Sequence, residues 1–258
     1  MNILIAQLAH IAPSTKVFDK YLRSAFKGQK KIDLIVLGDF VANHFFKEYR
    51  TKSSIKREFE ASKKYFLSLA KKHKSAIVAP IIEWDEGQIF KSILVAESNC
   101  DSPNLYRASR LMDFPHWDER AFFDNETLPH PKPLVFNIGD FKVSAIFGWE
   151  AHFDEVMIAL RKKGVDILCV PCANTFGSNM RWQRLMQIRA FLNSCVIIRA
   201  NRVGEFVENN SVWDFYGESF IALPDGSLGD MMGEKEGILI SEIEWENVEN
   251  IKNLWRFR

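Results

Sequence analysis

The sequence has few cysteines, no long apolar run and almost no net charge, and each absence excludes a class of protein. Four cysteines in 258 residues, unevenly spaced, are too few for a disulfide framework. No apolar run approaches the roughly 18 residues that a membrane-spanning helix needs. The 34 basic and 33 acidic residues nearly cancel, which argues against a dedicated nucleic-acid or anionic-membrane surface. We therefore expect no nucleic-acid partner and no membrane partner.

Targeting segments and linkers are also lacking. The first residues, Met1 to Gln7, have no basic stretch before their short apolar run, so they indicate a strand and not a signal peptide. With few cysteines and no secretion signal, we expect a reducing, cytoplasmic location. No segment rich in Ser, Pro or Gly divides the chain, and no repeat of fixed period occurs. We therefore expect one domain over residues 1–258.

Short runs rich in isoleucine and valine alternate with longer segments of helical spacing. The runs predict buried strands at residues 3–8, 32–37, 76–82, 93–96, 143–147, 165–170, 195–198, 220–223 and 238–240. Apolar residues at steps of three and four predict helices over 54–74, 154–163 and 180–193. The turn Leu223 to Ser227, in which Pro224 sets φ and Gly226 allows a positive φ, predicts two antiparallel strands. The fold class is therefore α/β with a mixed sheet.

The C-terminal segment, about residues 244–258, is too apolar for a free terminus. It contains Trp245, Val248, Leu254 and Trp255 within a short stretch. Large apolar side chains of this kind are usually covered in a folded protein. We expect the segment to pack against the body of the protein or against a partner subunit.

Two short motifs lack the partners that metal or redox chemistry needs. Cys169 and Cys172 form a CxxC pair, but no second pair stands at zinc-ligand spacing, and the pair ends a strand where a redox motif would begin a helix. Gly38 to His44 resembles part of a metallophosphoesterase signature, without the second acidic and histidine set of a two-metal site. We predict no metal and no cofactor. Cys169 is expected in the core, whereas Cys172 stands at a strand end, where pockets of α/β sheets form.

Eight further segments follow one another in a recognisable order. They are Ala6-Gln7, Gly38 to Phe40, Tyr106 to Leu111, Glu119 to Phe123, Ile146 to Glu155, Gly164 to Asn174, Trp182 to Gly204 and Gly217 to Gly226. Their order and spacing resemble the nitrilase, or carbon–nitrogen hydrolase, superfamily, and in motif the amidase and N-carbamoyl-amide hydrolase branches. The resemblance implies a four-layer α-β-β-α sandwich. It also implies pairing into a homodimer or higher homo-oligomer through a helical face.

The resemblance further implies hydrolysis of non-peptide carbon–nitrogen bonds by glutamate, lysine and cysteine, without a metal. A cysteine thiolate is a strong nucleophile that forms a thioester with the substrate. A glutamate takes the thiol proton and later activates water. A lysine ammonium and a backbone N–H stabilise the oxyanion that develops. A second glutamate positions the substrate or transfers a proton.

Three of these four positions are substituted in this sequence. The base position is Asp39, the lysine position is Ala108 and the nucleophile position is Gly148. Only the second acid, Glu119, matches. Gly148 has no side chain with which to form a covalent intermediate. Arg107 and Arg110 flank Ala108 and are candidates for the missing cation, although on a strand an immediate neighbour points to the opposite face.

The substitutions favour a degenerate member of the family, a pseudoenzyme that acts in binding or assembly. The scaffold motifs remain while the reactive positions change, which indicates a pocket put to another use. We expect Trp149, Glu150 and Asn174 to line this pocket. Its ligand would be a small amide, amine or carboxylate.

The alternative is an active amide or carbamoyl-amide hydrolase. In this hypothesis Cys172 or a water molecule is the nucleophile, and Glu119 and Asp39 serve as acid and base. The missing side chain at Gly148 would give the Cys172 sulfur or the water access to the substrate. The hypothesis fails if Cys172 lies away from both carboxylates. Functions outside the family, such as a metal-dependent phosphoesterase, remain a third option.

Overall fold

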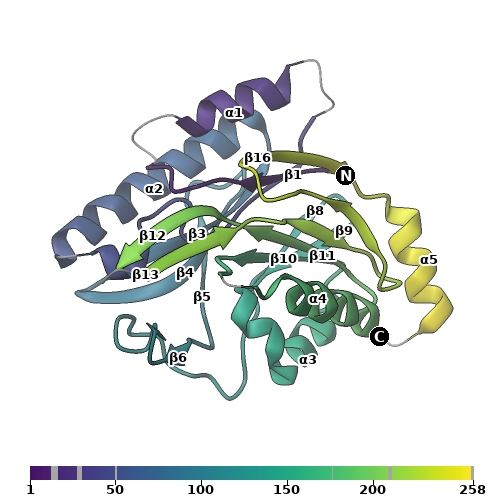
Figure 1. Ribbon diagram of the computed structural model, residues 1–258. Helices are drawn as coiled ribbons and strands as arrows, with labels where there is room; N and C mark the ends of the chain where they lie inside the picture. Colours follow the sequence, from purple (N-terminus) through teal and green to yellow (C-terminus); the bar gives the residue numbers. More distant parts are fainter. Residues whose placement is uncertain (13–16, 28–30, 50, 176, 209–210, 257–258) are drawn as a thin grey trace.

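Two six-stranded sheets packed face to face form the centre of the molecule (Figure 1). The computed structural model describes residues 1–258 except 13–16, 28–30, 50, 176, 209–210 and 257–258. The first sheet has the order β16 (Gly237–Glu242), β1 (Asn2–Gln7), β2 (Leu34–Leu37), β3 (Ala76–Asp85), β4 (Gln88–Ala96) and β5 (Asn104–Arg107). The second has the order β15 (Leu228–Met231), β14 (Phe220–Ala222), β11 (Val196–Asn201), β10 (Ile167–Cys172), β9 (Phe141–Ala145) and β8 (Val135–Ile138).

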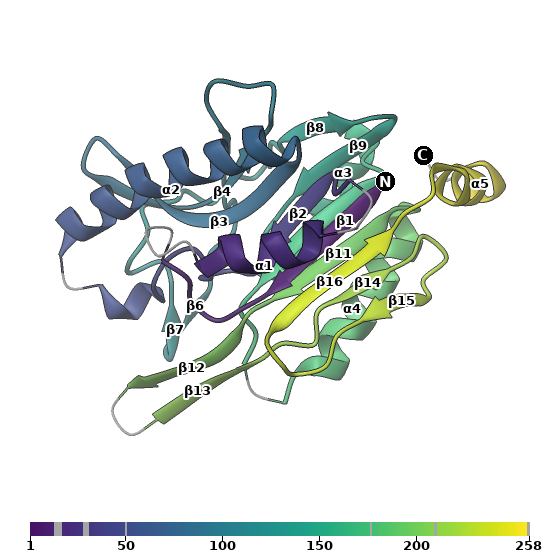
Figure 2. The same ribbon diagram turned by 90° about the horizontal axis from the view of Figure 1, so that it is seen from above.

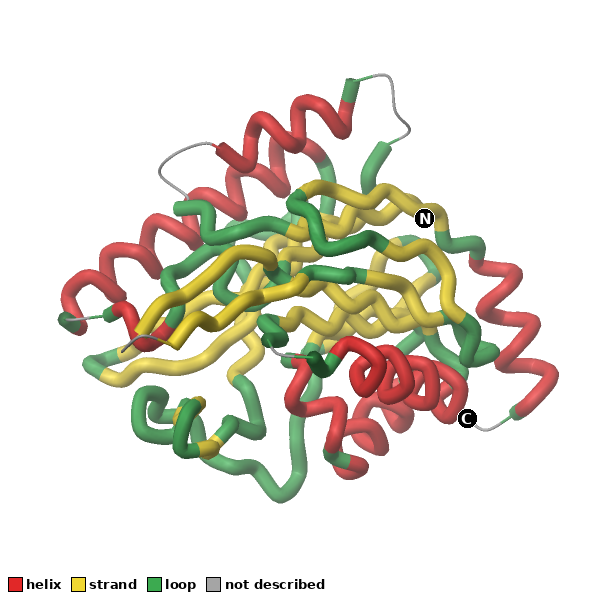
Figure 3. The backbone as a smooth tube through the Cα atoms, viewed as in Figure 1, coloured by secondary structure: helices red, strands yellow, loops and turns green. Residues whose placement is uncertain are grey.

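Helices cover the outer face of each sheet, as Figures 2 and 3 also show. The first sheet is covered by α1 (Val17–Phe26) and α2 (Lys52–His73), and the second by α3 (Asp154–Lys163) and α4 (Asn179–Asn193). The predicted four-layer α-β-β-α sandwich is therefore confirmed. The smaller elements are η2 (Phe46–Glu48), η3 (Gly148–His152), the β6 (Asp113–Phe114) and β7 (Trp117–Asp118) pair, and the β12 (Val203–Glu208) and β13 (Ser211–Tyr216) ribbon.

Alternation along the central strands explains why they are apolar on both faces. In β1, Ile3 and Ile5 belong to the core between the two sheets. Leu4 and Ala6 point the other way, into the layer under α1 and α2 with Phe18 and Leu22. A strand buried on both faces has no polar face, so it appears in the sequence as a continuous apolar run.

Parallel pairing brings the carboxyl ends of several strands to one region. β1, β2 and β3 run parallel to one another in the first sheet, and β9, β10 and β11 do so in the second. The strands that flank these two sets, β16 and β4 in the first sheet and β8 and β14 in the second, pair with them antiparallel. The turn predicted at Leu223 to Ser227 connects β14 and β15, which pair antiparallel, and Gly226 has a φ of 85°. Both sheets are therefore mixed, and loops that follow parallel strands meet at one edge of the sandwich.

The C-terminal helix α5 (Trp245–Trp255) lies beside the sandwich (Figure 2). Val248 is 1% exposed, and the Trp245 ring meets the Phe141 ring edge to face at 5.0 Å. The Lys252 ammonium lies 3.0 Å from the Asp166 carboxylate. At the end of the helix the Trp255 ring meets the Phe191 ring of α4 at 6.0 Å, whereas Leu254 is 73% exposed. None of the helices in the described ranges has the length and apolarity needed to cross a bilayer.

Val248→Asp is expected to destabilise the protein, because it places a carboxylate in the apolar contact between α5 and the sheets. We expect a loss of about 3 kcal/mol or more, seen as a fall in the melting temperature of roughly 5–10 °C. Leu254→Asp is the matched control and should leave the melting temperature unchanged. Equal melting temperatures for wild type and Val248→Asp would contradict the docking of α5.

Candidate active site

Two of the substituted positions, Asp39 and Gly148, meet Cys172 at the carboxyl ends of parallel strands. Asp39 follows β2, Gly148 follows β9 and begins η3, and Cys172 is the last residue of β10. The backbone N–H of Asp39 donates to the carbonyl of Cys172 at 3.0 Å, which joins the ends of β2 and β10 across the two sheets. The segments that the sequence analysis selected are therefore neighbours in space.

A buried lysine lies between the two predicted carboxylates. The ammonium of Lys91, on β4, is 2.9 Å from Asp39 Oδ2 and also forms an ion pair with Glu119 Oε1. Exposed fractions are 3% for Lys91, 5% for Asp39 and 1% for Glu119. The rings of Phe40 and Phe147 lie under the ammonium at 5.0 and 4.7 Å. The candidate site therefore has a cation, supplied by a residue that the sequence analysis did not select.

Backbone and indole donors hold the two carboxylates in place. The N–H of Phe40 donates to Asp39 Oδ1 at 3.0 Å. Trp117 Nε1 donates to Glu119 Oε1 at 3.0 Å, and the N–H of Met112 donates to Glu119 Oε2 at 3.1 Å. Buried carboxylates are tolerated when such donors and a cation replace the lost water.

Burial and charge shift the pKa values of Asp39 and Lys91. Burial raises the pKa of Asp39 above its ordinary value, although the nearby Lys91 ammonium opposes the change. Burial alone would lower the pKa of Lys91, but the charges of Asp39 and Glu119 outweigh it and raise that pKa. Lys91 is therefore charged at neutral pH. A carboxylate with a raised pKa is a better proton acceptor than an ordinary one.

The Cys172 sulfur occupies the space that a side chain at position 148 would need. A Cβ atom built on Gly148 would lie 2.5 Å from Cys172 Sγ, closer than real Cβ contacts allow. Cys172 is 2% exposed, and burial raises the pKa of its thiol to about 11, while Arg199 and Lys91 favour the thiolate and Asp39 opposes it. The thiol is thus neutral at rest and interacts electrostatically with Asp39 and Lys91.

Lys91, on β4, lies beside Ala108, the position on the adjacent segment that the family resemblance assigns to lysine. The backbone N–H of Ala108 donates to the carbonyl of Lys91 at 2.9 Å, and the pairing of β4 with β5 continues to this point. Residues opposite each other on paired strands project from the same face. The two arginines beside Ala108 are committed elsewhere, Arg107 to Glu83 and Arg110 to Glu155.

A signal for Lys91 was present in the sequence. Along β4, Ile89, Ile93 and Val95 alternate toward the core between the sheets, and Lys91 interrupts this series. A charged residue at an inward position of an apolar strand is rarely buried without a partner. The sequence did not reveal which partners it has, because Asp39 and Glu119 lie 52 and 28 residues away along the chain.

Two adjoining cavities open around this group. The inner cavity, of about 30 Å³, is lined by Asp39, Lys91, Gly148 and Cys172, among others. The outer one, which we call the vestibule, measures about 300 Å³. Its walls are Met112, Phe114, His116, Trp117, Trp149, His152, Ala173, Asn174, Thr175, Ser178, Arg181 and Trp182. Six residues line both spaces, so a small molecule in the vestibule would lie beside the Lys91 and Cys172 group.

Trp149 and Asn174 line both cavities, whereas Glu150 lines neither and is fully buried. One oxygen of Glu150 accepts hydrogen bonds from the Tyr106 hydroxyl at 2.7 Å and the Ser109 N–H at 2.7 Å. Its other oxygen accepts from the N–H of Phe147 at 2.9 Å. The expected role of Glu150 in lining the pocket is therefore corrected: its carboxylate joins the Ser109 segment to the start of η3.

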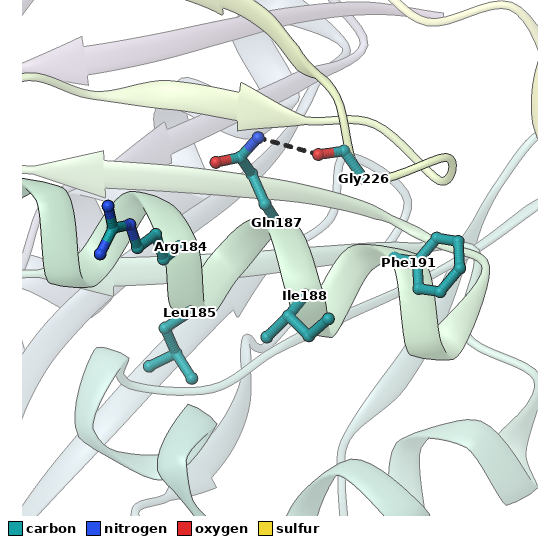
Figure 4. A pocket seen from close by; sticks show the side chains of 6 residues that line it. All are labelled: Arg184, Leu185, Gln187, Ile188, Phe191 and Gly226. Atoms are coloured by element: carbon teal, nitrogen blue, oxygen red, sulfur yellow. Dashed lines mark hydrogen bonds between the residues drawn. The ribbon is translucent and has the colours of Figure 1, made fainter.

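A larger hollow than these two lies elsewhere and has no reactive set of side chains (Figure 4). It measures about 540 Å³ and lies against α4, where Gln187 Nε2 donates to the carbonyl of Gly226 at 2.9 Å. Arg184 is its charged lining residue, and no thiol or carboxylate lines it within the described part of the chain. Among those residues no group of three or more His, Cys, Asp or Glu side chains could hold a metal ion.

Comparisons with known proteins agree with this architecture. A family model described as carbon-nitrogen hydrolase matches residues 5–253. The N-carbamoylputrescine amidase of Solanum tuberosum is 24% identical over 266 residues, which cover 95% of this chain and 85% of the relative. That of Solanum lycopersicum is 27% identical over 193 residues, covering 69% and 63%. A solved carbon-nitrogen hydrolase from Helicobacter pylori G27 has a TM-score of 0.88 at 23% identity and covers 100% of this chain and 94% of that one.

Lys91→Met is expected to destabilise the fold, because Asp39 and Glu119 would lose the cation that they share. We expect a loss of about 3–5 kcal/mol at pH 8. A carboxyl whose pKa is raised in the folded state opposes folding most when it is ionised, so the deficit should shrink as the pH falls toward 5. Melting temperatures between pH 5 and 8 test this. Lys71→Met, which removes an exposed ion pair with Asp101, is the control and should show almost no deficit. A deficit that grows on acidification would contradict the assignment.

Gly148→Ala is expected to force the Cys172 sulfur from its place. Overpacking of this kind costs about 1–3 kcal/mol. The cost should disappear when Cys172→Ala is added, because the atom in conflict is then absent, and a double-mutant cycle of melting curves measures the coupling. Gly233→Ala, which would meet no atom within 4 Å, is the control. Additive effects of the two substitutions would show that the sulfur does not occupy this space.

Proposed function

Because the chain belongs to the carbon–nitrogen hydrolase family, we propose that it hydrolyses small amides or carbamoyl-amides with Cys172 as the nucleophile. The observation that carries the proposal is the 2.5 Å separation between Cys172 Sγ and a Cβ built on Gly148. The sulfur stands where the family motif would otherwise supply its own cysteine. Lys91, beside Ala108, offers the cation that the motif otherwise supplies. Because Cys172 supplies a nucleophile and Lys91 a cation, these two residues favour the hydrolase hypothesis over the hypothesis of binding alone.

The chemistry follows from the groups around the inner cavity. Asp39 accepts the Cys172 proton as the sulfur attacks the carbonyl carbon, and a tetrahedral intermediate forms. The Lys91 ammonium stabilises the oxyanion of that intermediate. The carbon–nitrogen bond then breaks, the nitrogen takes the proton from Asp39, and ammonia or an amine leaves a thioester on Cys172.

The second half of the reaction restores the thiol. Asp39 accepts a proton from water as the water oxygen attacks the thioester carbon. The carbon–sulfur bond breaks, the sulfur recovers its proton, and the acid is released. Glu119 keeps the Lys91 ammonium in position throughout, through its ion pair and its bonds from Trp117 and Met112.

Pairing of two chains through a helical face stays a prediction. The outer helices expose Ile158 on α3 and Ile188 and Leu192 on α4, each at least 41% exposed. These side chains support the proposal that α3 and α4 form the contact. A cytoplasmic location stays a prediction as well.

Cys172→Ala is expected to abolish amide hydrolysis, with a loss on the order of 10⁶-fold in kcat if it behaves like loss of the nucleophile of a serine enzyme. Ammonia or amine release is measured over a panel of amides and carbamoyl-amines, with mass spectrometry of the intact protein to detect the thioester. Cys169→Ala, three residues earlier on the same strand and equally buried, is the control and should keep activity.

The outcomes separate the hypotheses. Turnover that survives Cys172→Ala would contradict the nucleophile and indicate water attack assisted by Asp39 and Glu119. A folded wild-type protein that hydrolyses no member of the panel would contradict the hydrolase and return the protein to the binding hypothesis.

A further inference from the structure

The vestibule differs in chemistry from the inner cavity. Its walls are largely aromatic, and the rings form a continuous set. Phe114 meets Trp149 edge to face at 5.3 Å, and His152 lies 4.9 Å from Trp149 and 5.1 Å from Trp182. Trp117 completes the wall next to the inner cavity. Flat apolar walls of this kind suit a flat apolar group.

The charge of the vestibule is positive. Arg181, on the first turn of α4, is the charged side chain among its described lining residues, and no carboxylate lies among them. No carboxylate in the described ranges forms an ion pair with Arg181, whereas Arg189, two turns further along α4, is paired with Asp154 at 2.6 Å. The Arg181 guanidinium is therefore available to a ligand.

Arg181 also affects its neighbour across the vestibule. Burial lowers the pKa of His152, and the charges of Arg181 and Arg189 lower it further, against a hydrogen bond to the Trp149 carbonyl. His152 is therefore neutral at pH 7, and the cation of this wall is Arg181. Among the described lining residues, a ligand that carries its own positive charge would meet a guanidinium and no carboxylate. Aromatic faces attract cations, but that attraction is opposed by a fixed charge of the same sign.

We propose that the vestibule selects amides whose far end is flat and apolar and carries a carboxylate, and that it rejects amides with a cationic amine end. This substrate class rests on the proposed function, since the reacting amide must lie in the inner cavity beside Cys172. The far end then lies against Phe114, Trp149 and Trp182, with its carboxylate toward Arg181. By this inference the protein differs in substrate from relatives named for N-carbamoylputrescine, which ends in an amine.

The test uses two ureas that differ only in the charge of the far end. 4-(Ureidomethyl)benzoate carries a carboxylate on its ring, and 4-(ureidomethyl)benzylamine carries an ammonium. We expect wild type to favour the benzoate by about tenfold or more in kcat/KM, and Arg181→Glu to reduce or invert this ratio by about tenfold. Arg184→Glu is the matched control: it makes the same charge change one turn along α4, at the separate hollow, and should leave the ratio unchanged.

Binding separates this inference from the proposed hydrolysis. Isothermal titration of the same two ureas to Cys172→Ala, alone and combined with Arg181→Glu or Arg184→Glu, gives affinities without turnover of the ligand. Tighter binding of the benzoate that is lost only in Arg181→Glu supports the selectivity even if no turnover occurs, in which case the hydrolase proposal alone fails. Equal binding of the two ureas, a preference for the benzylamine, or equal effects of the two substitutions would overturn the inference.

Discussion

A lysine ammonium held between two carboxylates inside the protein is the interaction on which the site depends. Lys91, Asp39 and Glu119 are each at most 5% exposed, so none of them can exchange its partners for water. An uncompensated charge at this depth costs several kcal/mol. The three groups therefore stabilise one another, and their pairing joins the end of β2, the inward face of β4 and the segment after β7. The walls of the inner cavity are positioned by the same contacts.

Either of two neighbouring strands in a sheet can supply the same kind of side chain to the same part of a site. Strands lie about 4.7–4.9 Å apart, and opposite residues project from the same face. Lys91 stands beside Ala108 across the β4 and β5 pair, and Cys172 ends the strand next to the one that Gly148 follows. At both places the residue at the family position is small, which leaves room for the longer neighbour. A sequence motif describes the residues of one strand, so it does not detect a reactive side chain that the neighbouring strand supplies instead.

The two cavities divide recognition from chemistry. The inner cavity, with its neutral thiol, its carboxylates and its lysine, can take a reacting amide and little more. The vestibule is ten times larger and is lined by aromatic rings and by the Arg181 guanidinium, so the rest of a ligand must match those walls. Trp149 and Asn174 belong to both spaces, because Trp149 lies in η3 directly after Gly148 and Asn174 comes two residues after Cys172.

The sequence by itself determined most of the strands and helices, because burial on both faces makes a central strand a continuous apolar run and burial on one face gives a helix its spacing of three and four. The arrangement of these elements in four layers followed from the resemblance to the carbon–nitrogen hydrolase family. The same resemblance selected Asp39 and Glu119, and the place of Cys172 at a strand end selected it as a candidate nucleophile. Short or half-exposed elements such as β5, β8 and α1 escaped it, since their apolar patterns are too brief. Only the tertiary structure decided that Lys91 joins Asp39 and Glu119, that Cys172 occupies the space at Gly148, and that Glu150 faces away. Contacts between residues tens of positions apart depend on how strands pair and sheets pack, and no local pattern records that.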